Sequence, residues 1–172
     1  MAQKRDNHDS LFRAAQTAER AFGRRKAAEL RQNARSAQQR KDWAQAESLW
    51  RRSLDEDPGD RMATAGLAQV LVYNGKLDEA QGFASELVSK WPEDENGPTV
   101  LARIAEERGD VAEAIAQWQR VLTLAMGRSQ ALIRLGRLMV AQGSLDEAKA
   151  YADQFALYAP DNPNAISLLA EI

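Results

Sequence analysis

The sequence predicts an all-α solenoid built from helix-turn-helix repeats of 34 residues. The nine residues GKLDEAQGF at 75–83 return as GSLDEAKAY at 143–151, and GDVAEAIAQW at 109–118 stands halfway between them. The composition agrees, because 44% of the residues are hydrophobic but only 6% are aromatic. Such a core is drawn mainly from Ala and Leu, which favours helices over a sheet.

The period divides the chain into four units, with a partial unit at 163–172. These units are residues 27–60, 61–94, 95–128 and 129–162. In the second unit, the pattern predicts a first helix (helix A) over about 62–73 and a second (helix B) over about 77–90. Asn74-Gly75 separates them.

The turn before helix B is marked by a column of glycines at Gly75, Gly109 and Gly143. Glycine suits a helix end that leaves through the left-handed conformation. Lys41 fills this column in the first unit, so its turn is less well specified. The residues expected to cap helix B are Asp42, Asp110 and Ser144, with Gln45, Glu113 and Glu147 as capping-box partners. Lys76 departs from this pattern.

Small residues recur where two helices must approach closely. They are Ala34, Ala68, Ala102 and Gly136 in helix A, and Ala46, Ala80, Ala114 and Ala148 in helix B. Four residues after each helix B alanine stands Trp50, Ala84, Trp118 or Ala152, on the same helix face. Each unit is then ended by Pro58, Pro92 or Pro160, and in the third unit by Gly127. Pro98 predicts that the third helix A begins after Asn96-Gly97.

These columns resemble the tetratricopeptide repeat, whose consensus has a small residue in helix A, Ala-x-x-x-aromatic in helix B and a late proline. The resemblance covers 136 of 172 residues. It implies a right-handed superhelix with helix A lining a concave groove, and a non-catalytic scaffold that binds a protein or peptide there. The groove residues that it implies are Arg31, Arg35, Gln69, Tyr73, Arg103 and Arg137.

An arginine ladder with one tyrosine suits an extended acidic segment of a partner. The same arginines also fit an ordinary solvated helix face, since Arg is a good helix former. Arg103 has Glu107 one turn away and would then be paired locally. Nucleic acid is not an expected partner, because exposed aromatics interleaved with Lys or Arg are missing.

The N-terminal segment, residues 1–26, is predicted to form a basic amphipathic helix with Ser10 as a cap. Its apolar stripe is Leu11, Ala15, Ala18 and Phe22. Residues 1–41 carry eleven Lys or Arg and four acids, a net charge of +7, whereas residues 42–172 carry −9. Three interpretations compete: packing on the first repeat, which we favour, self-association into a homo-oligomer, and contact with an anionic membrane, which we favour least.

The sequence indicates no catalytic, cofactor or metal site. It has no Cys and a single histidine, His8, and it shows no phosphate-binding glycine loop, nucleophile elbow or metal-ligand cluster. The lack of Cys favours a reducing compartment, and no apolar stretch predicts a signal peptide or a transmembrane span. We therefore expect a cytoplasmic protein that is not an enzyme.

A second hypothesis concerns the partial unit, PNAISLLAEI, at 163–172. It is either a capping helix or the point at which a longer chain was cut, because a repeat array needs a cap over its apolar end. Alanine-rich repeats of this style resemble those that precede polysaccharide-assembly domains in bacteria. The alternative function is thus the N-terminal repeat region of a larger bacterial enzyme, such as a glycosyltransferase, mediating self-association or complex assembly.

Overall fold

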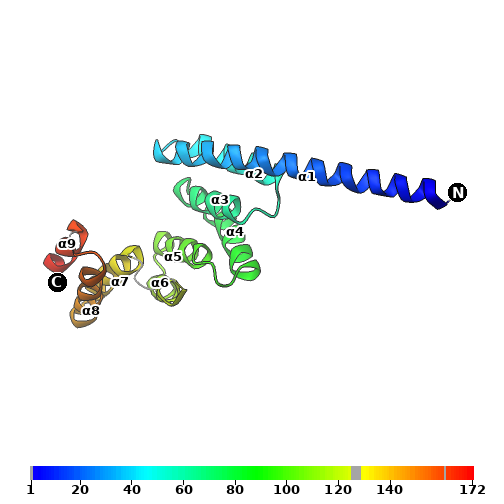
Figure 1. The fold of residues 1–172 in the computed structure, drawn as a ribbon. Coiled ribbons are helices and arrows are strands. Elements are labelled where there is room, and N and C mark those ends of the chain that lie inside the picture. The colour runs from blue at the N-terminus through cyan, green and yellow to red at the C-terminus, as the bar shows by residue number, and fades with distance from the viewer. Residues whose placement is uncertain (1, 125–128, 161) are drawn as a thin grey trace. The chain divides into compact units, whose positions relative to one another are not determined.

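The computed structural model describes residues 2–124, 129–160 and 162–172 (Figure 1). In these residues every regular element is an α-helix, which confirms the predicted all-α fold. The chain forms two compact units, Met1–Lys76 and Leu77–Ile172. The boundary falls inside the predicted second repeat, between its helix A and its helix B.

The first unit consists of α1 (Ala2–Gln39), α2 (Trp43–Glu56) and α3 (Arg61–Tyr73). Helix α1 packs against both α2 and α3. It is one continuous helix of 38 residues, so the N-terminal segment and the first helix A are not separate helices. Ser10 lies inside α1 rather than at its start, and the expected cap is therefore wrong.

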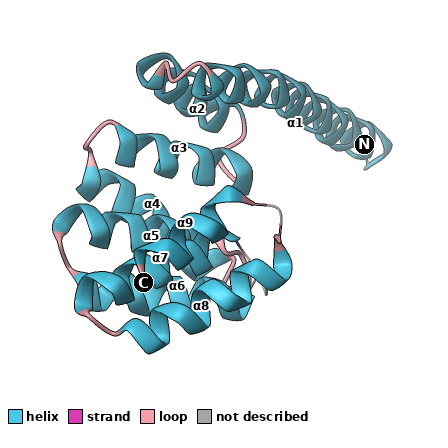
Figure 2. Ribbon diagram, turned by 90° about the vertical axis from the view of Figure 1, so that its left-hand side faces the viewer, coloured by secondary structure: helices cyan, strands magenta, loops and turns pink. Residues whose placement is uncertain are grey.

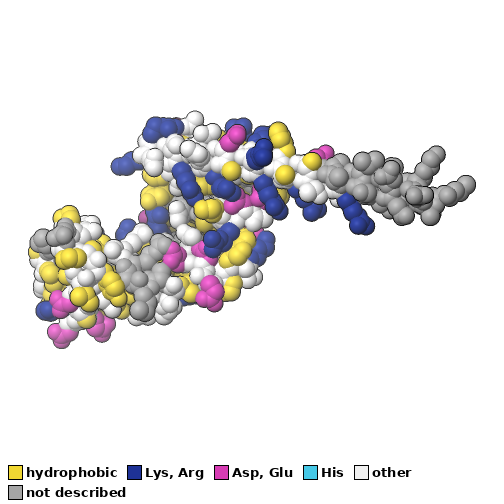
Figure 3. Space-filling model, in the orientation of Figure 1, with side chains coloured by type: hydrophobic (Ala, Val, Ile, Leu, Met, Phe, Trp, Pro, Cys, Tyr) yellow, Lys and Arg dark blue, Asp and Glu magenta, His cyan; other side chains and the backbone are white. Residues whose placement is uncertain are grey.

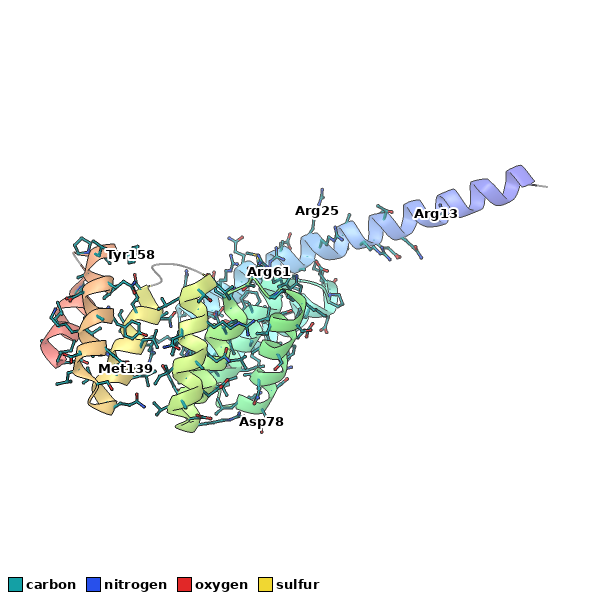
Figure 4. The ribbon with its side chains drawn as sticks, turned by 90° about the horizontal axis from the view of Figure 1, so that it is seen from below. Arg13, Arg25, Arg61, Asp78, Met139 and Tyr158 are labelled. Atoms are coloured by element: carbon teal, nitrogen blue, oxygen red, sulfur yellow. The ribbon has the colours of Figure 1, made fainter. Side chains whose placement is uncertain are left out.

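The two described residues of the N-terminal apolar stripe, Ala18 and Phe22, lie in solvent rather than against a repeat. The Ala18 side chain is exposed, and Phe22 is 70% exposed; the side chains of Leu11 and Ala15 lie outside the described part of the structure. Lys and Arg side chains gather along this helix (Figure 3), and Arg25 projects away from it (Figure 4). Packing on the first repeat, the interpretation that the sequence favours, is not seen for these two described side chains.

The described residues of the second unit form the helices α4 to α9, drawn in cyan in Figure 2. They are α4 (Leu77–Lys90), α5 (Asn96–Arg108), α6 (Val111–Leu124), α7 (Ser129–Gln142), α8 (Leu145–Tyr158) and α9 (Pro163–Glu171). The four B helices, α2, α4, α6 and α8, begin at residues 43, 77, 111 and 145 and end at residues 56, 90, 124 and 158. Both series advance by 34, so the predicted period is confirmed. Gly127, the expected stop of the third unit, lies outside the described residues.

The turn into each B helix has the same backbone in all four repeats. Gly75, Gly109 and Gly143 have φ of 72°, 73° and 76°, and Lys41 has φ of 61°. In the second repeat Gly75 N donates to Val72 O and Lys76 N donates to Leu71 O, the pair of bonds that defines a Schellman motif. Lys41 therefore adopts the glycine conformation despite its Cβ, and the turn of the first repeat is as well formed as the others.

The predicted caps of helix B are confirmed in two cases. Asp42 Oδ1 accepts from Gln45 N, and Asp110 Oδ1 accepts from Glu113 N, each at 3.1 Å. Ser144 makes no side-chain cap bond. The capping-box partners do not reach back, because the backbone N–H that each would accept is already donated to the preceding helix, as from Asp42 N to Ala37 O.

The small-residue columns form the core, as predicted: the alanines of both columns are completely buried. Trp50 and Trp118 are also buried, and their indole Nε1 atoms donate to Gln38 Oε1 at 3.0 Å and to Glu106 Oε1 at 2.7 Å. The two acceptors are 68 residues apart, as the tryptophans are. Each tryptophan therefore fills its core position and satisfies its single donor on helix A of its own repeat.

Helix α5 begins at Asn96, whereas the sequence predicts a start after Gly97. Asp94 Oδ1 accepts from Asn96 N at 2.8 Å, which fixes the first turn before the proline. Pro98 then lies in that first turn, where its missing N–H costs nothing. Gly97 is required for packing, because a Cβ there would lie 2.8 Å from Val88 Cγ2 on α4.

Candidate functional site

The helix A faces carry the six residues that the resemblance implies for a groove. Four of them, Arg31, Arg35, Gln69 and Tyr73, lie on α1 and α3 in the first unit. Arg103 and Arg137 lie on α5 and α7 in the second unit. The first four therefore lie in one unit and the last two in the other.

Arg35 is the most open arginine of the first set. Its side chain is exposed, and its Nη2 atom lies 3.9 Å from Met62 Sδ on α3. The Met62 side chain is itself 46% exposed. The α1 and α3 face thus offers a guanidinium beside an apolar thioether, a combination that suits a segment with both acidic and apolar side chains.

Arg31 has a structural partner. It forms an ion pair with Asp60 Oδ2, and the Asp60 side chain is buried. The other oxygen, Oδ1, accepts from Met62 N at 2.9 Å and from Ala63 N at 3.2 Å, so Asp60 caps α3. Arg31 therefore ties the first helix A to the start of the second.

Sequence reasoning missed this capping column, although its spacing was available. The capping residues are Asp60, Asp94 and Asn162. Asp94 stands 34 residues after Asp60, and Asn162 stands 68 residues after Asp94. Each lies one or two residues before the first residue of its helix. Short acceptor side chains at that period predict N-caps.

Tyr73 stacks on another aromatic ring. Its ring lies parallel to that of Trp43, with 4.1 Å between centroids and 5° between planes. Tyr73 is nevertheless 50% exposed. The pair fastens the end of α3 to the start of α2 and leaves a tyrosine face in solvent. Gln69 is half-buried and takes part in a contact within the chain.

In the second unit the two arginines already have contacts. Arg137 Nη2 lies 3.4 Å from Glu171 Oε1 on α9, and the two side chains are 46% and 39% exposed. Arg103 is half-buried and interacts within the chain. A third arginine, Arg134, pairs with Glu106 Oε2 at 3.2 Å. The exposed pair of Arg137 with Glu171 is weak, so another carboxylate would compete with Glu171 for Arg137.

A buried carboxylate that sequence reasoning missed lies in the first unit. Glu47 on α2 is only 8% exposed. Its Oε1 accepts from Lys76 Nζ at 2.6 Å and from Arg51 Nη2 at 2.9 Å, and its Oε2 accepts from Asn74 Nδ2 at 2.6 Å. Burial alone would raise the pKa of Glu47, but the hydrogen bonds from Lys76, Arg51 and Asn74 lower it from 4.5 to about 2.

Metal sites and membrane-spanning helices are both absent from the described residues. These residues contain no group of His, Cys, Asp or Glu side chains arranged to hold a metal ion. Among the same residues, no helix combines the length and the apolar character that crossing a bilayer requires.

Similar proteins are found at the levels of sequence and structure. Cellulose synthase operon protein C of Pseudomonas fluorescens (strain SBW25) is 28% identical over 130 residues, which is 70% of this chain and 10% of that protein. The chain thus spans about a tenth of the length of this curated relative. Among solved structures, TTC0263, a thermophilic TPR protein of Thermus thermophilus, matches with 20% identity and a TM-score of 0.73 over 84% of this chain and 80% of that one.

A second solved structure, YrrB, is described as a TPR protein with an unusual peptide-binding site. It matches with 16% identity and a TM-score of 0.66 over 84% of this chain and 74% of that one. At these identities the two structures show the shared fold alone. The tetratricopeptide repeat profile matches residues 37–104 and 105–172, which is most of the sequence. The chain therefore belongs to the tetratricopeptide repeat family.

Proposed function

We propose that this protein is a non-catalytic scaffold that binds an acidic segment of a partner protein on its helix A faces. The observation that carries the proposal is Arg35, an exposed residue whose guanidinium Nη2 lies 3.9 Å from the Met62 thioether sulfur. A sulfur does not neutralise a guanidinium, so Arg35 keeps its charge available for a carboxylate. The exposed Tyr73 ring adds apolar area on α3.

In the second unit, Arg137 and Arg103 would offer cations on helix A faces of that unit. The pair between Arg137 and Glu171 is long for a charge-assisted bond and is open to water. A carboxylate from the partner would compete with Glu171 at little cost. The general role also suits the family, because repeat arrays of stacked helices expose extended binding surfaces.

A selection of peptide binders tests this proposal even though the partner is unidentified. Peptides selected against the chain from a random display library are expected to be enriched in Asp and Glu. Their affinity should fall at least tenfold in an Arg35→Glu, Arg103→Glu, Arg137→Glu variant, because three favourable charge contacts become repulsive. Isothermal titration calorimetry measures the affinity, and circular dichroism checks that the helicity of the variant is unchanged.

The matched control reverses three cations elsewhere: Arg25→Glu on α1, Lys90→Glu on α4 and Lys149→Glu on α8. These side chains are exposed. Equal loss in the control and the test variant would mean that overall charge, and not the helix A faces, governs binding. Loss of affinity in the control alone would indicate that the binding site does not lie on the helix A faces.

A second function is favoured by one observation, the similarity to a segment of cellulose synthase operon protein C. We propose as the alternative that the chain is a repeat region of a larger polysaccharide-assembly protein and mediates self-association or complex assembly there. The sequence of the gene beyond the codon for Ile172 tests this. An open reading frame that continues into a further domain supports it, and a stop codon at that point counts against it.

A further inference from the structure

An open pocket of about 610 Å³ lies in the first unit, between α2 and the turn that follows α3. Its charged lining residues are Glu47, Arg51, Arg52 and Lys76. Arg35, which is on α1, is not among the lining residues. The pocket is therefore distinct from the Arg35 part of the helix A faces.

The pocket has an excess of positive charge. Three cations face one carboxylate, which leaves a formal net charge of +2 on the four charged lining residues. The Glu47 carboxylate is also fully engaged, since Oε1 accepts from Lys76 and Arg51 and Oε2 accepts from Asn74. It holds these donors in place, and the charge of the exposed Arg52 is not balanced by it.

Lys76 is placed where the fold does not require a lysine. The equivalent residues are Asp42, Asp110 and Ser144. The turn uses only the backbone N–H of Lys76, which donates to Leu71 O at 2.9 Å. A cation at the start of α4 also opposes the helix dipole, which favours negative charge there. The side chain is instead bonded to Glu47, at the pocket.

We propose that this pocket binds an oxyanion, a phosphate or a carboxylate group, held by Arg52 and Lys76 beside the Glu47 network. Guanidinium and ammonium groups are the side chains that recognise these groups, the first through paired N–H donors and the second as a point charge. Glu47 acts as a positioning residue: it fixes Lys76 and Arg51 before the anion arrives, which lowers the entropic cost of binding.

The alternative explanation is that the hydrogen bonds among Glu47, Asn74 and Lys76 only stabilise the packing of α2 against α3. Arg52 separates the two explanations, because it lines the pocket but makes none of the bonds to Glu47. Replacement of Arg52 should weaken an anion without loosening the helices. The variant Arg52→Gln keeps the polarity of the side chain and removes its charge.

The experiment is a titration of the ¹⁵N-labelled chain with inorganic phosphate at constant ionic strength, followed by two-dimensional NMR. Saturable shifts are expected at residues 44–52 and 74–76. In Arg52→Gln the dissociation constant should rise about three- to tenfold, the loss of one charged contact at an open site. Arg25→Gln, an exposed arginine on α1 (Figure 4), serves as the matched control and should leave it unchanged.

A parallel titration with glutarate distinguishes the two sources of the anion. Tighter binding of phosphate would identify a phosphate ligand, and equal or tighter binding of glutarate a carboxylate ligand. Shifts that never saturate, that spread over all cationic surfaces, or that are the same in Arg52→Gln would overturn the proposal. Urea unfolding of Arg52→Gln should match that of the unaltered chain, so that a binding loss is not a folding loss.

Discussion

At the scale of single residues, Lys41 is the one described non-glycine residue with a left-handed backbone. A side chain with a Cβ is strained there, whereas glycine is not. We predict that Lys41→Gly raises the free energy of unfolding by about 0.5 to 1 kcal/mol. Urea denaturation followed by circular dichroism measures the change. The Lys41 side chain is exposed, so the gain is not offset by lost packing.

The reverse change at Gly109 is the control. A Cβ built on Gly109 meets no atom within 4 Å, so its cost would be conformational alone. Gly109→Ala should lower the free energy of unfolding by about 1 kcal/mol. If both substitutions moved stability in the same direction, the left-handed conformation would not be the cause of either effect.

The lowered pKa of Glu47 predicts that the free energy of unfolding depends on pH. Its pKa is about 2 in the folded chain, below the ordinary value of 4.5. A depressed folded pKa stabilises the fold above the unfolded pKa, and this stabilisation is lost as the pH falls from about 4.5 toward 2. We predict that Glu47→Gln lowers the free energy of unfolding by about 2 kcal/mol at pH 7.

The test compares urea unfolding of Glu47→Gln and the unaltered chain from pH 7 to pH 2. The difference between them should shrink steadily below pH 4.5, because the carboxyl becomes neutral like the amide. A difference that stays constant down to about pH 2 would mean that the amide disturbs packing rather than charge. Glu86→Gln, at an exposed pair with Lys90 on α4, is the control and should have little effect.

At the scale of helices, Trp50 on α2 packs so closely against Gly66 on α3 that no side chain fits at residue 66. A Cβ at Gly66 would overlap the Trp50 ring, which is buried. We predict that Gly66→Ala lowers the free energy of unfolding by about 2 kcal/mol through overpacking. Gly82→Ala on α4, where a Cβ meets nothing within 4 Å, should instead raise it by about 0.5 to 1 kcal/mol through helix propensity.

Chemical denaturation of the two alanine variants decides between packing and propensity. Both place alanine inside a helix, so propensity alone predicts stabilisation in each. Destabilisation of Gly66→Ala together with stabilisation of Gly82→Ala supports the packing explanation. Stabilisation of both would show that the tryptophan moves aside without cost.

Most helix boundaries could be predicted from the sequence because local chemistry repeats at each turn. Gly75 and the aspartates after Lys41 and Gly109 mark the start of helix B, and the structure follows them to the residue. The predicted capping box was wrong because the backbone N–H of the residue before helix B has two possible acceptors. It donates to a carbonyl of the preceding helix, in the Schellman motif, and not to the side chain three residues later. The sequence offers no way to rank those two bonds.

The continuity of α1 was missed because the 34-residue period starts the first unit at residue 27, so the segment before it was treated as a separate helix. Gly23, the one glycine between residues 13 and 26, does not end the helix. In the structure it permits a close approach, since a Cβ there would lie 2.9 Å from Glu56 O. A glycine inside a helix and a glycine that ends one look alike in sequence, because the difference depends on a neighbour far along the chain.

At the scale of the whole molecule, the family followed from the periodicity of the sequence, but the candidate sites did not. Arg137 with Glu171 is a pair between neighbouring repeats, and Arg31 pairs with Asp60, which caps the next helix A. Glu47 gathers donors from α2 and from the turn after α3. Such pairs depend on how repeats stack, and many charged residues of each unit are compatible with the same spacing. The sequence therefore indicates which helix faces carry the charged residues, but it does not determine which of these residues pair with one another.

Repeat proteins are held together by contacts between neighbours, so strain in one repeat should be felt mainly nearby. The two compact units make this testable. Gly66→Ala strains the packing of α2 on α3 in the first unit. Gly136→Ala strains α7 against α9 in the second, because its Cβ would lie 2.6 Å from Leu168 Cδ2. Amide hydrogen exchange measured by mass spectrometry reports the two units separately.

We predict opposite patterns of exchange in these variants. In Gly66→Ala the amides of α2 and α3 should exchange more than about tenfold faster while those of α7 and α8 change little, since about 1.4 kcal/mol corresponds to tenfold. In Gly136→Ala the pattern should invert. Uniform acceleration in both variants would mean that the array opens only as a whole. In that case a partner bound to either unit would stabilise the other equally, and binding at the Arg35 face would be coupled to the second unit.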